Sequence, residues 1–102
     1  MTKDSEKVLC YIYRDYLNKI KKGQSKTSAR KFSSEFSSSC NSLTKWHPDD
    51  IDTAINELDH LGYLRTNILG EFQLTDDAVT HMENRFKNRI VEITDYISKF
   101  IP

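Results

Sequence analysis

The sequence predicts a mainly α protein with a small β-ribbon, folded as one domain over residues 1–102. Apolar residues recur every three or four positions along most of the chain, which is the period of an amphipathic helix. Only residues 63–74 carry the pattern of two short strands joined by a turn. A chain of 102 residues, of which 37% are hydrophobic and 29% charged, suits one small folded domain.

Residues 5–20 are predicted to form the first helix. Apolar and aromatic residues fall at positions i, i+3, i+4, i+7, i+8 and i+11 of this segment and define one buried stripe. These residues are Leu9, Ile12, Tyr13, Tyr16, Leu17 and Ile20. Lys21 and Lys22 suit the negative end of the helix, and Gly23 then allows the chain to turn.

A second, shorter helix is predicted to begin at Thr27 or Ser28, because either hydroxyl could cap its first turn. The spacing of its apolar residues places three of them on one inward face: Ala29, Phe32 and Phe36. A polar loop over residues 37–42 would follow, and Leu43 would return to the core.

The third predicted helix begins at Pro48, whose fixed φ and missing N–H suit the first helical position. His47 would cap it, and Trp46 would pack on Ile51 as a hydrophobic staple. Its apolar stripe consists of Ile51, Ala54, Ile55, Leu58 and Leu61. Gly62 would stop the helix.

Two strands, over residues 63–68 and 71–74, would then pair around a turn at Leu69–Gly70. Ile68 and Leu69, at the tip of this hairpin, are expected to be exposed as a small apolar contact point.

Thr75 is predicted to cap a long C-terminal helix within residues 76–101. Its apolar positions are spaced on average by 3.5 residues, as in a coiled coil: Val79, Met82, Phe86, Ile90, Ile93, Ile97 and Phe100. At ~1.5 Å per residue the helix would measure ~37 Å, more than the width of so small a domain. A homodimer is therefore predicted, with an interface of Phe86, Ile90, Ile93, Ile97 and Phe100. The alternative is that this segment folds back along the first helix of the same chain.

Residues 58–64, Leu-Asp-His-Leu-Gly-Tyr-Leu, and residues 70–78, Gly-Glu-Phe-Gln-Leu-Thr-Asp-Asp-Ala, resemble part of the winged helix-turn-helix proteins. They match the recognition helix, the wing and the following helix of small MarR-type, PadR-type and phage transcription regulators. The resemblance covers about a third of the chain, and it departs at Ala78, where many relatives have glycine. It implies a winged helix-turn-helix fold with a long C-terminal helix, and a dimeric regulator of transcription that binds double-stranded DNA.

The formal net charge of zero conceals a strong asymmetry. Residues 1–31 contain nine Lys or Arg and three Asp or Glu, a net charge of +6, whereas residues 32–77 contain two and nine, a net charge of −7. Such a separation is typical of a nucleic-acid surface, and it also arises when two parts of a chain attract each other.

The DNA-binding hypothesis assigns a role to each candidate residue. Phosphates would be bound by Lys26, Arg30, Lys31 and Lys45, and the DNA backbone beside the wing by Arg65. Thr53, Asn56 and His60 would read bases, because they lie opposite the buried stripe of the third helix.

The charge of the third helix argues against DNA. It carries five carboxylates and no Lys or Arg, and phosphates should repel it. The alternative is an interaction module that keeps this fold and binds a basic protein through Asp49, Asp52, Glu57 and Asp59.

Other functions have little support in the sequence. It contains no glycine-rich phosphate loop, no nucleophile paired with a base and no metal-ligand spacing, so we expect neither an enzyme nor a cofactor. No apolar run is long enough to span a membrane. Cys10 and Cys40 lack a paired-ligand motif and are interpreted as reduced thiols in a cytoplasmic protein.

Overall fold

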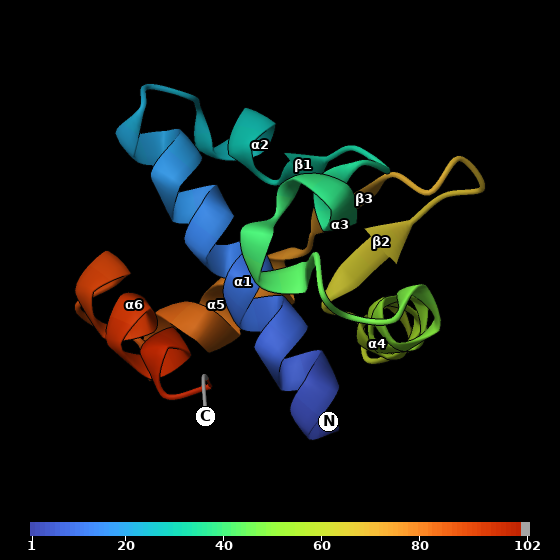
Figure 1. Ribbon diagram of the computed structural model, residues 1–102. Coiled ribbons are helices and arrows are strands. Elements are labelled where there is room, and N and C mark those ends of the chain that lie inside the picture. The colour runs from blue at the N-terminus through green and yellow to red at the C-terminus, as the bar shows by residue number, and fades with distance from the viewer. Residues whose placement is uncertain (101–102) are drawn as a thin grey trace.

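The computed structural model describes residues 1–100, which form a mainly helical fold with a small antiparallel sheet at one side (Figure 1). This arrangement confirms the predicted class, mainly α with a little β structure. In chain order the elements are α1 (Lys3–Lys21), α2 (Lys26–Ala29), β1 (Lys31–Phe32), α3 (Phe36–Ser39), the 3-10 helix η1 (Asn41–Leu43), α4 (Pro48–His60), β2 (Leu64–Thr66), β3 (Phe72–Leu74), α5 (Asp76–Arg85) and α6 (Ile90–Ser98).

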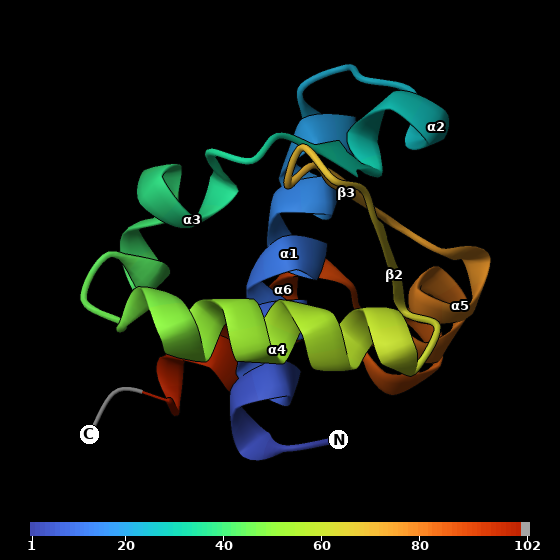
Figure 2. The same cartoon turned by 90° about the vertical axis from the view of Figure 1, so that its right-hand side faces the viewer.

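Helix α1 lies at the centre of the fold and contacts both α4 and α6. Figure 2 shows α4 crossing α1. The predicted stripe of α1 is buried, except that Ile20 is only partly covered. Val8, Cys10 and Tyr11 are buried as well, because helices cover α1 from more than one side. The Thr2 hydroxyl caps α1 by accepting a hydrogen bond from the Ser5 N–H at 3.2 Å.

The sheet has the strand order β1-β3-β2, and both pairings are antiparallel. The predicted hairpin is confirmed, although β2 and β3 are shorter than expected. Its turn is held by the Asn67 side chain, whose Oδ1 accepts hydrogen bonds from the N–H groups of Leu69 and Glu71. Gly70 supplies a positive φ of 81°, which few other residues adopt readily.

The predicted second helix is wrong. Residues 26–29 form one helical turn capped by Ser25, and Phe32 lies in strand β1. The Phe32 ring stacks on Phe72 of β3 at 5.2 Å and meets Phe36 edge-on at 5.2 Å. Strand pairing with β3 has thus overridden the local helical spacing, a result that depends on residues forty positions away.

Helix α4 matches its prediction closely. It begins at Pro48, and the Nδ1 atom of His47 accepts a hydrogen bond from the Asp49 N–H at 3.1 Å. Ile51, Ala54 and Leu58 are buried, and Ile55 is partly buried. The predicted burial of Leu61 is wrong, because this residue follows the end of the helix and is 48% exposed. Thr75 caps α5 as predicted, by accepting a hydrogen bond from the Ala78 N–H at 3.2 Å. Leu43 is buried before α4, also as predicted.

The prediction of one long C-terminal helix is wrong. The chain turns over residues 86–89, where Arg89 has a φ of 51°, and α6 folds back onto α1. Ile93 is 0% and Ile97 6% exposed, so the monomer itself covers the face that was assigned to a dimer interface. Phe86 is buried in the same core, and Ile90 and Phe100 pack against it. Within residues 1–100, no helix is both long enough and apolar enough to cross a membrane.

A polar cluster connects three helices at this end of the core. Glu6 of α1 accepts hydrogen bonds from Arg85 of α5 at 2.5 Å and from the Tyr96 hydroxyl of α6. Arg85 also donates to the Tyr96 hydroxyl at 2.6 Å. The Tyr96 hydroxyl and Arg85 stabilise the carboxylate and lower the pKa of Glu6.

This cluster predicts a loss of stability in acid. The pKa of Glu6 is lowered in the folded state, so its contribution is complete above the unfolded value of 4.5 and disappears as the pH falls through the folded value. We expect Glu6→Gln to cost about 1 kcal/mol at pH 7, a figure reduced for partial exposure, and to cost less near pH 3. Urea titrations at both pH values measure this, with Asp95→Asn on exposed α6 surface as the control. If Glu6→Gln lowered the free energy of unfolding equally at both pH values, the stabilising role of the Glu6 carboxylate would be contradicted.

Candidate interaction surface

The candidate site is the exposed face of α4, which lies opposite the stripe that packs on the core. Its residues Asp49, Asp52, Thr53, Asn56, Asp59 and His60 are all exposed. The Thr53 hydroxyl donates to the Asp49 carbonyl of its own helix at 2.8 Å. The face therefore presents several carboxylates, one amide and one imidazole on a rigid element.

Two carboxylates at the edge of this face are held by distant parts of the chain. Glu57 accepts a hydrogen bond from the Thr2 N–H at 2.7 Å, and this bond lowers the pKa of Glu57. Asp59 accepts one from the Thr66 hydroxyl of β2 at 2.7 Å. No local pattern in the sequence indicates the first contact, because its partners lie 55 positions apart. A hydrogen bond to an ionised carboxylate favours the charged form, so the contact with Thr2 keeps Glu57 negative.

A cleft of about 290 Å³ lies between α4, the β2–β3 hairpin and the segment before α3. Asp52, Ile55 and Asn56 line it from α4, and Thr66 and Asn67 line it from the hairpin. Beyond the cleft, the hairpin tip carries Ile68, which is 100% exposed, and Leu69, which is 71% exposed. This confirms the predicted exposure of the tip and puts an apolar contact on the hairpin that borders the cleft.

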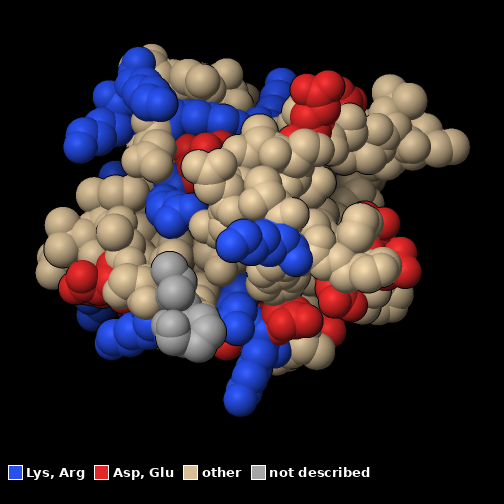
Figure 3. Space-filling view, in the orientation of Figure 1, with Lys and Arg blue, Asp and Glu red and all other residues tan. Residues whose placement is uncertain are grey.

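The predicted phosphate contacts do not gather around α4. Lys26 lies in α2, and Lys31 lies in β1 at the edge of the sheet. Lys45 is an exposed residue three positions before the first turn of α4. Arg65 lies on β2, which contacts α4, and lines a pocket together with Asp59. Figure 3 shows Lys and Arg side chains gathered over the end of α1 and over α2, and Asp and Glu side chains over α4.

Arg30 already has a structural partner. Its guanidinium forms an ion pair with Asp76 at the start of α5, and its side chain is 27% exposed. The hydrogen bond with Asp76 raises the pKa of Arg30 and lowers that of Asp76. The residue therefore links the segment before β1 to α5. This ion pair gives Arg30 a role within the fold that does not involve DNA.

Lys31 and Arg65 are brought together by the sheet. Lys31 of β1 and Arg65 of β2 are both paired with Gln73 of the central strand, so the three residues form one row across the sheet. Lys31 and Arg65 are exposed. This is the only pair among the predicted phosphate-binding residues that the described fold places in one row.

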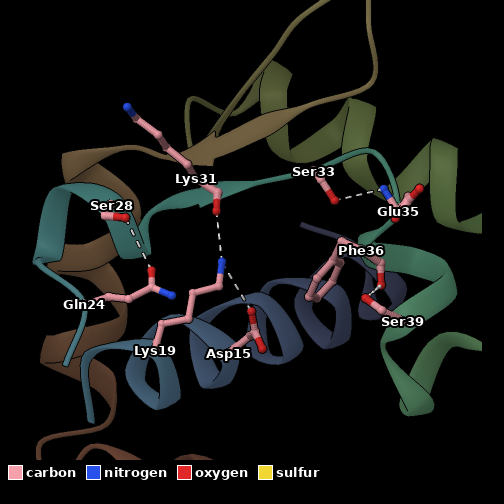
Figure 4. Close-up of polar contacts among 9 residues, drawn as sticks. All are labelled: Asp15, Lys19, Gln24, Ser28, Lys31, Ser33, Glu35, Phe36 and Ser39. Carbon is pink, nitrogen blue, oxygen red and sulfur yellow. Dashed lines mark hydrogen bonds and ion pairs between the residues drawn. The ribbon is translucent and has the colours of Figure 1, made fainter. Parts of the chain in front are cut away.

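Lys19, a lysine close to Lys31, makes contacts within the fold. Its Nζ atom lies 3.7 Å from the centroid of the Phe32 ring and donates a hydrogen bond to the Lys31 carbonyl at 2.9 Å. It also pairs with Asp15 at 3.5 Å (Figure 4). In the same view, the Lys31 side chain points away from α1 and leaves its ammonium group free of this cluster. Lys19 thus stabilises the attachment of β1 to α1.

Within residues 1–100, no group of His, Cys, Asp and Glu has a geometry that could hold a metal ion. Both cysteines are free thiols, and burial raises the pKa of Cys10 to about 12. Comparisons with known proteins found no matching family model, no matching curated protein and no matching solved structure.

Proposed function

We propose that this chain is a winged-helix protein that binds a basic partner protein through α4 and the adjoining cleft. The order of α4, the β2–β3 hairpin and α5 supports this, because it matches the order of recognition helix, wing and following helix in winged helix-turn-helix proteins. The function rests on one observation: the exposed face of α4 is rich in carboxylates, and the basic residues that could offset them lie on other elements.

Electrostatics distinguishes this surface from one that binds DNA. A helix in the major groove lies between two rows of phosphates, so each exposed carboxylate there raises the free energy of the complex. The same carboxylates attract a cationic protein segment and orient it as it approaches. The cleft beside Asp52 and Asn56 would accept side chains of such a segment, and Ile68 and Leu69 would add an apolar contact.

This proposal predicts a salt-sensitive interaction that charge reversal abolishes. We expect a fluorescein-labelled peptide of alternating Lys and Leu to bind the protein. The double variant Asp52→Lys/Asn56→Lys should weaken that binding at least about tenfold, because like charges are then placed face to face. Fluorescence anisotropy at low and at physiological salt measures both effects.

The matched control is Asp95→Lys, an exposed carboxylate of α6 on another element. It changes the net charge by +2, against +3 for the double variant, and should leave the affinity nearly unchanged. If the control and the α4 variant lost the same peptide affinity, net charge alone would explain the loss. The proposal would then fail. The same would follow if the peptide did not bind at low salt.

DNA binding is the second candidate, and the row of Lys31, Gln73 and Arg65 favours it. In the same anisotropy experiment, a 20-base-pair duplex replaces the peptide. DNA binding by the sheet predicts that the duplex binds in a salt-sensitive way. This binding would be lost in Lys31→Ala/Arg65→Ala and kept in the α4 variant, and that result would support DNA, not a basic protein, as the partner.

A further inference from the structure

The turn between α5 and α6, residues 86–89, holds an unfavourable backbone conformation. Arg89 has a φ of 51°, and it is the single residue other than glycine with a positive φ in residues 1–100. An L-residue with a side chain adopts this conformation at an energetic cost. Arg89 is also the N-cap residue of α6, and its side chain makes no capping hydrogen bond. We call residues 86–89 the hinge.

Most of the hinge could become helical without moving a buried side chain. Lys87, Asn88 and Arg89 are exposed. Phe86 is the buried residue of the hinge, and its N–H already donates a hydrogen bond to the Met82 carbonyl of α5. The apolar residues also keep a helical spacing through the hinge, from Met82 to Phe86 and from there to Ile90. A single helix over α5 and α6 would therefore present one continuous apolar stripe.

In such a straight helix, α6 would leave the α1 of its own chain. The inner face of α6, with Ile93 and Ile97, would then be exposed to water. It could be buried again only on a surface like that of α1. A second copy of the chain offers that surface, because its own α6 has left in the same way. Every contact between α1 and α6 can be formed again between the two copies, including the hydrogen bond from Tyr96 to Glu6.

We propose that two copies exchange α6 through the straightened hinge and form a symmetric dimer, each α6 packing on the partner's α1. The dimer forms the helical hydrogen bonds that the hinge lacks and releases the strained conformation of Arg89. The exchange concerns the core and the hinge, so it goes beyond the proposed function and does not depend on it.

Two substitutions of one residue test this exchange. Arg89→Gly accepts a φ of 51° without strain, which stabilises the monomer. Glycine also weakens a continuous helix, which destabilises the dimer, so both effects favour the monomer. We expect it to lower the association constant of the dimer by about 100-fold or more, since each dimer contains two hinges. Arg89→Ala removes the same side chain but keeps the strain and favours the helix, so it should raise the association constant.

Size-exclusion chromatography with light scattering measures the dimer fraction of the full chain and of both variants over a range of concentrations. Samples are first held near the melting temperature and cooled, because α6 must leave α1 before it can exchange. Circular dichroism verifies that each variant is folded. Opposite shifts of the dimer fraction in the two variants support the exchange.

Mixing provides a second readout. Tagged and untagged chains should form mixed dimers after the warm incubation but not after brief mixing in the cold. Three results would overturn the proposal: a chain that stays monomeric at all concentrations, equal dimer fractions in Arg89→Gly and Arg89→Ala, or mixed dimers that form at once in the cold. Loss of peptide binding by α4 would leave all of these measurements unchanged, so the two proposals fail separately.

Discussion

Replacing Phe72 by alanine is expected to lower the free energy of unfolding by about 3–5 kcal/mol. Phe72 is 5% exposed and contacts the rings of Phe32 and Phe36, with centroid distances of 5.2 and 5.7 Å. Its removal leaves a cavity where β1, β3 and α3 meet, and the two remaining rings lose their common contact. Urea unfolding followed by circular dichroism measures the change.

Ile68→Ala on the same hairpin is the control for this substitution. Ile68 is 100% exposed, so we expect its replacement to change stability by less than about 0.5 kcal/mol. If both variants lost the same stability, the three rings would not form a stabilising contact between β1 and the hairpin.

Replacing Ile93 by alanine is expected to cost about 2–5 kcal/mol, because its side chain is fully buried between α6 and the core. The neighbouring residue Val91 is 64% exposed, and Val91→Ala should cost less than about 0.5 kcal/mol. Thermal and urea unfolding of the two variants provide the comparison. An equally small effect in both would mean that α6 does not cover α1.

The Ile93 experiment also separates the two arrangements of the C-terminal segment. A free apolar face would leave Ile93 exposed in the monomer, and its replacement would then weaken only association. In the observed fold the same replacement lowers the stability of each chain, whatever its concentration. Exchange of α6 preserves this burial, because Ile93 then packs on the α1 of the partner.

Local patterns predicted the elements whose signals lie within a few residues. The stripe of α1, the Pro48 start of α4, the Thr75 cap and the hairpin turn were all correctly read from the sequence. In each of these segments, capping, turn chemistry and apolar period point to the same structure, and the tertiary contacts agree with them.

The wrong predictions concern segments whose structure depends on residues far away in the sequence. Phe32 has helical spacing from Ala29 and Phe36, but pairing with Phe72 places it in a strand. The C-terminal segment has the spacing of one long helix, but burial of Ile93 on α1 bends it at Arg89. No local pattern reports either interaction, because both partners are remote in sequence.

For the candidate site, too, some features follow from the sequence and others only from the tertiary structure. The sequence alone determined that the third helix carries five carboxylates without Lys or Arg, and that basic residues concentrate before Phe32. Only the tertiary structure decided where these charges lie relative to each other: Arg30 pairs with Asp76, and Lys31 lies in a row with Arg65 on the sheet. The physical reason is that composition and period act through neighbouring residues, whereas the position of a charge depends on how the whole core packs.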